Sequence, residues 1–173
     1  MKNMPVQKQR GFVSIEAMIV LIIIAIGIGL AVARSAGLFG SSNVGEEQGN
    51  IASIIASTRA MKGSNGYGTS GTNLVPSLIK LKAVPKNMSN VSGVLYNVYG
   101  GSVTLVSTGM GFTITSSNLP EDACVTLATR VAKSDAEQTK INSGSAITGE
   151  VTTVNATTSC SGASNSISWT ISS

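Results

Sequence analysis

An acidic side chain inside an apolar run is the first feature of this sequence that could do chemistry. Glu16 lies in the stretch "QRGFVSIEAMIVLIIIAIGIGLAVA", which covers residues 9–33. A carboxylate at that depth costs on the order of 2.5–3.5 kcal/mol on membrane-insertion scales, and more on an isolated helix. Neither a plain membrane anchor nor an ordinary secretory signal gives this carboxylate a purpose.

The second candidate is a pair of cysteines, Cys124 and Cys160, which stand 36 positions apart. The chain has no histidine and no second cysteine pair, which argues against a zinc site. If the protein is exported, the two thiols should form a disulfide, and the alternative is a pair of buried free thiols. Closing a loop of this size would stabilise the fold by about 3–4 kcal/mol in the chain-entropy model.

The sequence contains few other residue patterns that are typical of catalytic sites. The absence of histidine removes the usual general base, and no hydrolase, phosphate-loop or dinucleotide-binding motif occurs. The acidic pair Glu121 and Asp122 is better interpreted as acids at a helix start than as a hydrolytic dyad, because adjacent residues of a helix do not face one another. We therefore expect neither an enzyme nor a bound cofactor or metal.

The net charge of +4 is mostly an N-terminal effect, since three basic residues precede residue 12. From Phe12 onward, nine Lys and Arg stand against eight Asp and Glu, so direct nucleic-acid binding is not predicted. Residues 12–33 would form a helix of about 33 Å, enough to cross a bilayer. Lys8 and Arg10 would hold its N-terminal side in the cytoplasm.

The remaining chain must supply a domain in which the two cysteines can meet. Residues 46–62 have helical periodicity, with Glu46 and Glu47 placed favourably near a helix start and Gly63 as a natural stop. The apolar face of this amphipathic helix is formed by Ile51, Ile54, Ile55, Thr58 and Met61. We expect this face to lie on a β-sheet.

Residues 63–91 are predicted to form a loop with one or two helical turns, and strands follow. A second helix is predicted over 119–134, with Cys124 on its apolar face and pointing inward. The pair Gly100-Gly101 is a tight-turn signal between the first two strands. The predicted strands cover 93–100, 101–108, 111–117, 146–158 and 165–173.

The N-terminal features together resemble a type IV prepilin. The basic leader "KQRG", residues 8–11, ends in Gly11 and is followed by "FVSIE", residues 12–16. The resemblance implies that a prepilin peptidase cleaves between Gly11 and Phe12, and that the new Phe12 amine is methylated. It also implies that Glu16 neutralises the N-terminal amine of an adjacent subunit inside a filament, which agrees with the need of a buried charge for a partner.

The resemblance extends to the type IVb subgroup through the candidate Cys124–Cys160 loop and the helix that carries "DACVTLAT". It implies an α+β fold, in which a long N-terminal helix packs on an antiparallel sheet with a C-terminal disulfide-bounded region. The implied divisions are a leader (1–11), a transmembrane and assembly helix (12–34) and a globular head (35–173). Within the head they are the helix of about 46–62, an α–β loop (63–91) and the sheet with the disulfide-bounded region (92–173).

As a pilin, the chain would be a major structural subunit, not an enzyme. It would wait in the inner membrane among lipids and then polymerise into an extracellular homopolymer for adhesion, aggregation or conjugative DNA transfer. The implied partners are the peptidase, a membrane platform with its ATPase, and minor pilins. Small residues such as Gly27 and Gly29 would allow close helix packing, and we expect the helix to melt locally at these two glycines.

Two alternatives remain open. One is a minor pilin or a type II secretion pseudopilin, which would share the N-terminal cleavage site and the glutamate of the apolar helix. The other is a secreted β-rich binding module with an ordinary signal peptide, cut after the "AVA" at 31–33.

Overall fold

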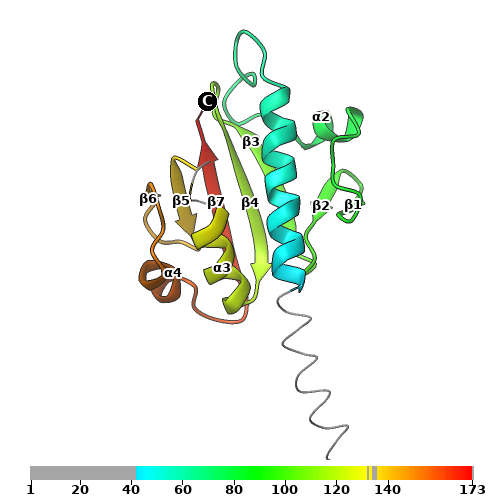
Figure 1. Cartoon of the computed structure of the whole chain (residues 1–173). Coiled ribbons are helices and arrows are strands. Elements are labelled where there is room, and N and C mark those ends of the chain that lie inside the picture. Colours follow the sequence, from blue (N-terminus) through cyan, green and yellow to red (C-terminus); the bar gives the residue numbers. More distant parts are fainter. Residues whose placement is uncertain (1–41, 132, 134–135, 173) are drawn as a thin grey trace, which may run out of the picture. The chain divides into compact units, whose positions relative to one another are not determined.

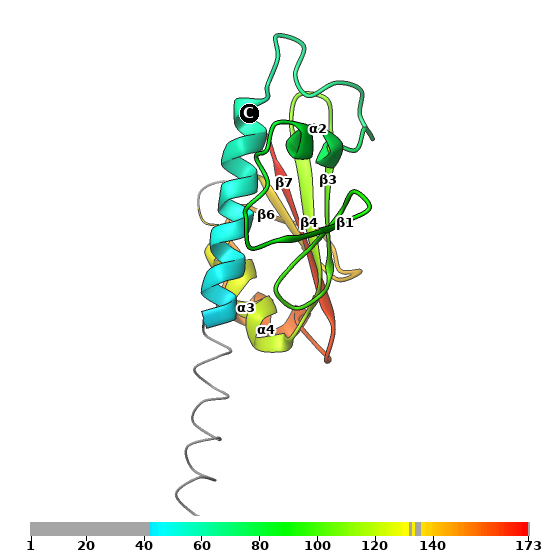
Figure 2. The same ribbon diagram turned by 90° about the vertical axis from the view of Figure 1, so that its right-hand side faces the viewer.

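The computed structural model describes residues 42–131, 133 and 136–172, which belong to one compact unit. A helix over residues 42–60 lies against an antiparallel sheet of seven strands in the order β1-β2-β3-β4-β7-β5-β6 (Figure 1). Figure 2 shows that this helix and α3 (Glu121–Val131) lie on the same side of the sheet. The α+β architecture predicted from the sequence is confirmed for this part of the chain.

The sheet is built from short edge strands and longer central ones. Every pair of neighbouring strands runs antiparallel. The strands are β1 (Ser89–Val91), β2 (Val94–Tyr96), β3 (Ser102–Ser107), β4 (Phe112–Leu119), β5 (Gln138–Ile141), β6 (Ile147–Thr148) and β7 (Asn165–Ile171). The remaining helices are α2 (Val75–Lys80) and α4 (Thr153–Ser159).

The last strand occupies a central position in the sheet. β7 pairs with β4 on one side and with β5 on the other, so strands from distant parts of the sequence meet there. Its residues alternate: Ile167, Trp169 and Ile171 are fully buried, and the serine and threonine residues between them are half-buried on the opposite face. This period-2 alternation is what a sheet with one face on the core requires.

The turn between β2 and β3 explains the Gly100-Gly101 pair. Gly100 has a φ of +75°, a conformation that glycine adopts without steric penalty. A Cβ atom on Gly101 would collide with the backbone carbonyl of Ser117 on β4. The predicted turn is confirmed, and close approach of the two backbones is the reason for its second glycine.

The long helix begins earlier than predicted. It covers 42–60 in the described chain and includes Gly45 and Gly49, so Glu46 and Glu47 do not mark its start. Ile51, Ile54, Ile55 and Thr58 are buried against the sheet as predicted. Glu47 is buried on the same face, which its interpretation as a helix-start acid did not foresee.

The prediction of a strand over 146–158 is wrong for most of its length. Only Ile147–Thr148 form a strand, and Thr153–Ser159 form α4. The Thr152 side chain caps this helix by accepting a hydrogen bond from the backbone N–H of Asn155 at 3.2 Å, and Ala156 is fully buried. Capping and tertiary packing therefore override the strand preference of a Thr- and Val-rich segment.

Two strands are absent from the sequence prediction. β1 lies inside the segment predicted as a loop, and its three residues are all exposed. β5 lies after α3, where residues 138–141 alternate between exposed and buried side chains over only four positions. Within the described residues, no helix has the length and apolar character needed to cross a membrane. The predicted span over 12–33 lies outside them.

Candidate functional site: the disulfide-bounded region and the helix–sheet junction

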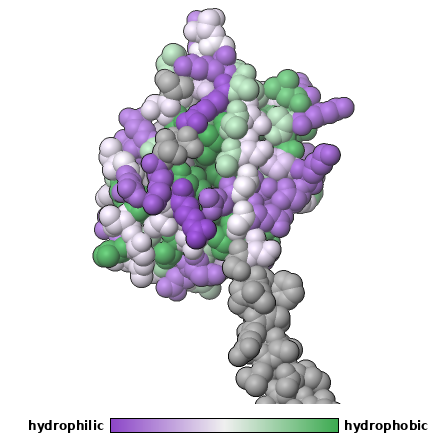
Figure 3. Space-filling model, in the orientation of Figure 1, coloured by the Kyte–Doolittle hydropathy of each residue, from purple (hydrophilic) through white to green (hydrophobic). Residues whose placement is uncertain are grey.

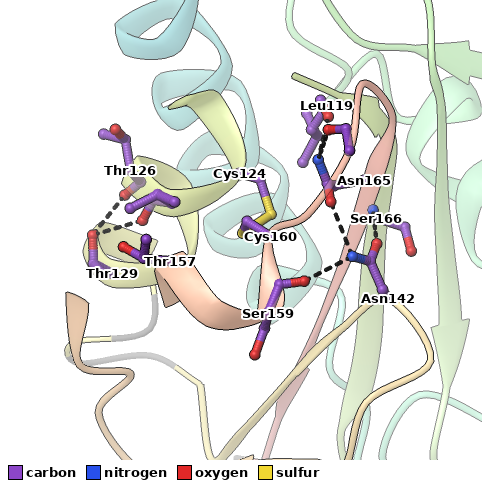
Figure 4. Close-up of a disulfide and its surroundings, with 12 residues drawn as sticks. Leu119, Cys124, Thr126, Thr129, Asn142, Thr157, Ser159, Cys160, Asn165 and Ser166 are labelled. Atoms are coloured by element: carbon purple, nitrogen blue, oxygen red, sulfur yellow. Dashed lines mark hydrogen bonds between the residues drawn. A yellow bond between two sulfur atoms is a disulfide. The ribbon is translucent and has the colours of Figure 1, made fainter. Parts of the chain in front are cut away.

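The two cysteines form a disulfide that joins α3 to the end of α4 (Figure 4). Cys124 lies in the first half of α3, and Cys160 is the C-cap residue of α4. Both side chains are fully buried, and their Cα atoms lie 5.8 Å apart. The bond encloses β5, β6 and α4. β5 and β6 form one edge of the sheet and are joined to its other strands through β7, so the disulfide fastens this edge to α3.

Two asparagine side chains reinforce this closure. Asn142 donates from Nδ2 to the Ser159 carbonyl and to Oδ1 of Asn165, both at 2.9 Å, and its Oδ1 accepts from the Ser166 backbone N–H (Figure 4). Asn165 in turn donates to the carbonyl of Leu119 at 3.1 Å. These bonds tie together the ends of β5, α4 and β4 at the start of β7.

The disulfide-bounded region presents a threonine-rich outer surface. Thr153, Thr157 and Thr158 on α4 are exposed, and the neighbouring Val154 is 74% exposed. Within the described residues, no cluster of His, Cys, Asp and Glu could hold a metal ion.

A second polar arrangement lies under the long helix. Glu47 is fully buried and accepts a hydrogen bond at Oε1 from the Ser116 hydroxyl of β4 at 3.0 Å. The Ser116 oxygen accepts from Nδ2 of Asn97 at 2.9 Å, and Asn97 accepts the Gly101 N–H at 2.7 Å. A chain of hydrogen bonds therefore connects the helix, the sheet and the β2–β3 turn.

The Glu47 carboxyl is only partly satisfied. Its Oε2 atom has no hydrogen-bond partner of ordinary geometry, and neither has Nδ2 of the nearby Asn50. Burial raises the pKa of Glu47 above its ordinary value of 4.5, and Ser116, the Val98 backbone and Asn50 only partly oppose this rise. The junction therefore shifts the Glu47 carboxyl toward its neutral form, relative to a carboxyl in water.

Tyr99 lies in the same environment. Its hydroxyl is buried without a hydrogen-bond partner. Burial, with a smaller contribution from the charges of Asp122 and Glu47, raises its pKa to about 12. The phenol therefore stays neutral near pH 7, and the junction is a buried polar cluster that links the long helix to the sheet.

The fold and its disulfide agree with a match to a known protein family. The family model described as PilS N terminal matches residues 41–172. The chain belongs to this family. A type IVb pilin from Salmonella typhi has a similar structure, with a TM-score of 0.64 and 29% identity, covering 75% of this chain and 99% of that chain. No curated protein sequence matches the chain.

A second solved structure shares the fold. TcpA, a type IV pilin from Vibrio cholerae El Tor biotype, has a TM-score of 0.57 and 16% identity, covering 76% of this chain and 99% of that chain. At this identity the likeness concerns the fold alone. Both structures are pilins. The head of this PilS-family chain has the type IV pilin fold, in the form found in the type IVb pilin.

The site residues predicted for this pilin divide into two groups. Cys124 and Cys160 form the expected disulfide. The residues assigned to cleavage, methylation, assembly charge and helix flexibility lie outside the described residues and stay predictions: Gly11, Phe12, Glu16, Gly27 and Gly29.

Sequence reasoning missed the polar residues that position the pilin's disulfide-bounded region and helix. Asn142 and Asn165 sit in a chain so rich in asparagine that no single one stands out. Glu47 could have been found, because it lies four residues before Ile51 and thus on the same helix face. Its partner Ser116 is recognisable only once β4 is placed.

Proposed function

We propose that this pilin is the major structural subunit of an extracellular type IV pilus. The observation that carries the proposal is the pilin fold with its closed disulfide-bounded region, in a chain whose N-terminus resembles a prepilin. The subunit is inserted in the inner membrane, with residues 12–33 as its anchor. A membrane platform and a cytoplasmic ATPase then transfer it into a homopolymer, together with minor pilins.

Processing creates the charge on which assembly depends. A prepilin peptidase cuts between Gly11 and Phe12, and methylation of the new Phe12 amine leaves it positively charged. Glu16 pairs with this amine on a neighbouring subunit as the helices enter the filament core. The carboxylate is costly in the isolated subunit, and a correctly staggered neighbour offsets that cost.

The head supplies the outer contacts of the filament. The α–β loop (63–91) and the disulfide-bounded region form subunit contacts and the exposed surface. Exposed Val154 on α4 supports this role, because a hydrophobic side chain that meets a different surface on the next copy gives a heterologous, open-ended contact. We assign the pilus to adhesion, aggregation or conjugative DNA transfer.

Replacement of Glu16 tests the proposed function. We expect Glu16→Ala to be cleaved and inserted like the wild-type chain but to yield no filaments in sheared surface fractions. Glu16→Asp, which keeps the charge, should restore part of the yield. Normal piliation by Glu16→Ala would contradict the assigned role.

Two further measurements separate the pilin from its alternatives. N-terminal sequencing should find methylated Phe12, whereas a start at Arg34 would indicate a secreted module. Abundance of this chain in sheared filaments should identify a major subunit, and a trace amount would indicate a minor pilin.

A filament map should show unwound helix at Gly27 and Gly29, and an unbroken helix over 24–30 would contradict that expectation.

A further inference from the structure

Basic charge is concentrated in one part of the head. Residues 48–120 contain five Lys and Arg and no Asp or Glu. Residues 121–172, by contrast, contain five acidic and three basic residues. The near-neutral balance of the chain from Phe12 onward therefore hides a basic region and an acidic one.

An apolar groove lies within the basic region. It has a volume of about 390 Å³ and is lined by residues from the end of the long helix, the loop after it and α2. Its apolar lining includes Met61, Leu74 and Leu81. Tyr67 also lines it, is 7% exposed, and carries a hydroxyl that has no hydrogen-bond partner.

Leu81 stands out at the rim of this groove, because 63% of its surface is exposed. It is the C-cap residue of α2, and the next two backbone N–H groups bond to carbonyls of α2 at 3.0 Å. The leucine is therefore held by a closed helix end, on a rigid element. Because Leu81 is continuous with the apolar lining of the groove, it extends one apolar surface, and such surfaces serve as interaction sites.

Three exposed lysines are next in the sequence to residues that line this groove. Lys80 and Lys82 flank Leu81 in the sequence, and Lys62 lies between two lining residues, Met61 and Gly63. None of the three ammonium groups forms an ion pair within the described residues. Figure 3 shows strongly hydrophilic side chains beside hydrophobic ones over the α2 side of the head.

We propose that this basic groove binds the surface of a membrane that contains anionic phospholipid. Leu81 enters the boundary between headgroups and acyl chains, and the lysines contact lipid phosphates, as in other basic and amphipathic membrane-binding segments. The long stems of the lysines allow their charged ends to stay at the headgroup level.

A membrane fits this surface better than a nucleic acid. Single strands bind to exposed aromatic platforms, but within residues 48–120 Tyr67 and Phe112 are buried and the other two tyrosines are half-buried. The exposed leucine between two lysines can neither stack on a base nor form a hydrogen bond with a nucleic acid. Charge and apolar character together favour a lipid headgroup layer.

The test uses sheared pili and sedimentable vesicles, and so it rests on the proposed function. Wild-type pili should bind vesicles of phosphatidylcholine mixed with phosphatidylglycerol and should not bind vesicles of phosphatidylcholine alone. Binding should weaken as salt rises from about 0.1 M to about 1 M, because the screening length falls from about 10 Å to about 3 Å. Absence of pili would contradict the proposed function, whereas intact pili that ignore anionic vesicles would overturn only this inference.

Matched variants locate the surface. Lys80→Gln/Lys82→Gln should bind anionic vesicles on the order of 25-fold more weakly, at roughly fivefold per lysine. Leu81→Ser should weaken binding without changing its salt dependence. The control Lys133→Gln/Lys140→Gln removes the same charge outside the basic region and should bind like the wild type. Unchanged binding by the first variant, or preference of wild-type pili for duplex DNA over anionic vesicles, would overturn the inference.

Discussion

At the scale of single residues, Glu47 joins the long helix to the sheet through a carboxyl group that is buried and only partly hydrogen-bonded. Such a group stabilises the fold best when it is neutral, because an ionised carboxylate loses its hydration on burial. The Asn97–Ser116 pair supports one of its two oxygens. The protonation state of Glu47 should therefore influence how firmly the helix is held.

The pH dependence of stability tests this interpretation. In the folded head the pKa of Glu47 is raised above 4.5, so above pH 4.5 the unfolded chain releases a proton that the folded chain retains. The free energy of unfolding should then fall as pH rises through this window. We expect Glu47→Gln to remove this decline and to be more stable than the wild type at pH 7.

Urea unfolding of a head fragment of residues 40–173 is a suitable measurement, because these residues form one compact unit. Glu137→Gln makes the same chemical change at an exposed position and is the control. Equal pH profiles for Glu47→Gln and the wild type would show that burial of this carboxyl has no energetic consequence.

At the scale of elements, the long helix carries two glycines that the head itself does not require. Gly45 and Gly49 are helical and exposed, and a Cβ atom at either position would meet nothing within 4 Å. Glycine in a helix is less favourable than alanine by about 0.5–1 kcal/mol. The helix therefore forms because its buried face packs on the sheet, not because of its local propensity.

Substitution of these glycines gives an element-scale prediction. Gly49→Ala should raise the free energy of unfolding of the head by about 0.5–1 kcal/mol, since it lowers backbone entropy only in the unfolded chain. Gly101→Ala should lower it, because a Cβ atom there collides with the Ser117 carbonyl. Urea midpoints of the two variants, moving in opposite directions from the wild type, would check both expectations.

The disulfide connects two elements that the sheet alone does not hold together. Removal of the bond in Cys124→Ala/Cys160→Ala should lower the free energy of unfolding by about 3–4 kcal/mol. Reductant should lower the stability of the wild type by a similar amount and leave the double variant unchanged. A double variant as stable as the oxidised wild type would show that α3 and α4 dock without the covalent link.

At the scale of the whole molecule, the chain must be almost complete before the sheet can form. β7 is the last strand, yet it separates β4 from β5 and carries the fully buried Ile167, Trp169 and Ile171. The pairing of β7 with β4 and β5 therefore joins residues far apart in the chain, and long loops must close before these contacts can form.

Truncation tests this dependence. A chain that ends at Ser164 should fail to accumulate a protease-resistant head, because the buried faces of β4 and β5 lose their shared partner. A chain that ends at Ile171 should resist protease like the wild type. Protease resistance in the shorter chain would show that β4 and β5 can close the sheet directly.

Local sequence patterns were enough to predict the class of protein and the elements with strong signals. Helical periodicity over Ile51–Thr58 and alternation in β7 each reflect a single buried face, which a short window of residues reveals. The combination of a basic leader, Gly11, Phe12 and Glu16 indicates a prepilin from nine consecutive residues, 8–16. The pairing of the two cysteines followed from their number and from expected export.

Features that depend on distant partners emerged only in the folded chain. The Thr-rich segment after Thr152 became α4, because a capped helix can bury Ala156 and present Cys160 to Cys124. The role of Glu47 is visible only in the folded chain, where Ser116 of β4 lies beneath the helix and donates a hydrogen bond to its carboxyl group. Likewise the groove beside Leu81 exists only because the end of the long helix lies near α2. Each of these outcomes depends on packing between residues far apart in the chain, which local sequence patterns do not encode.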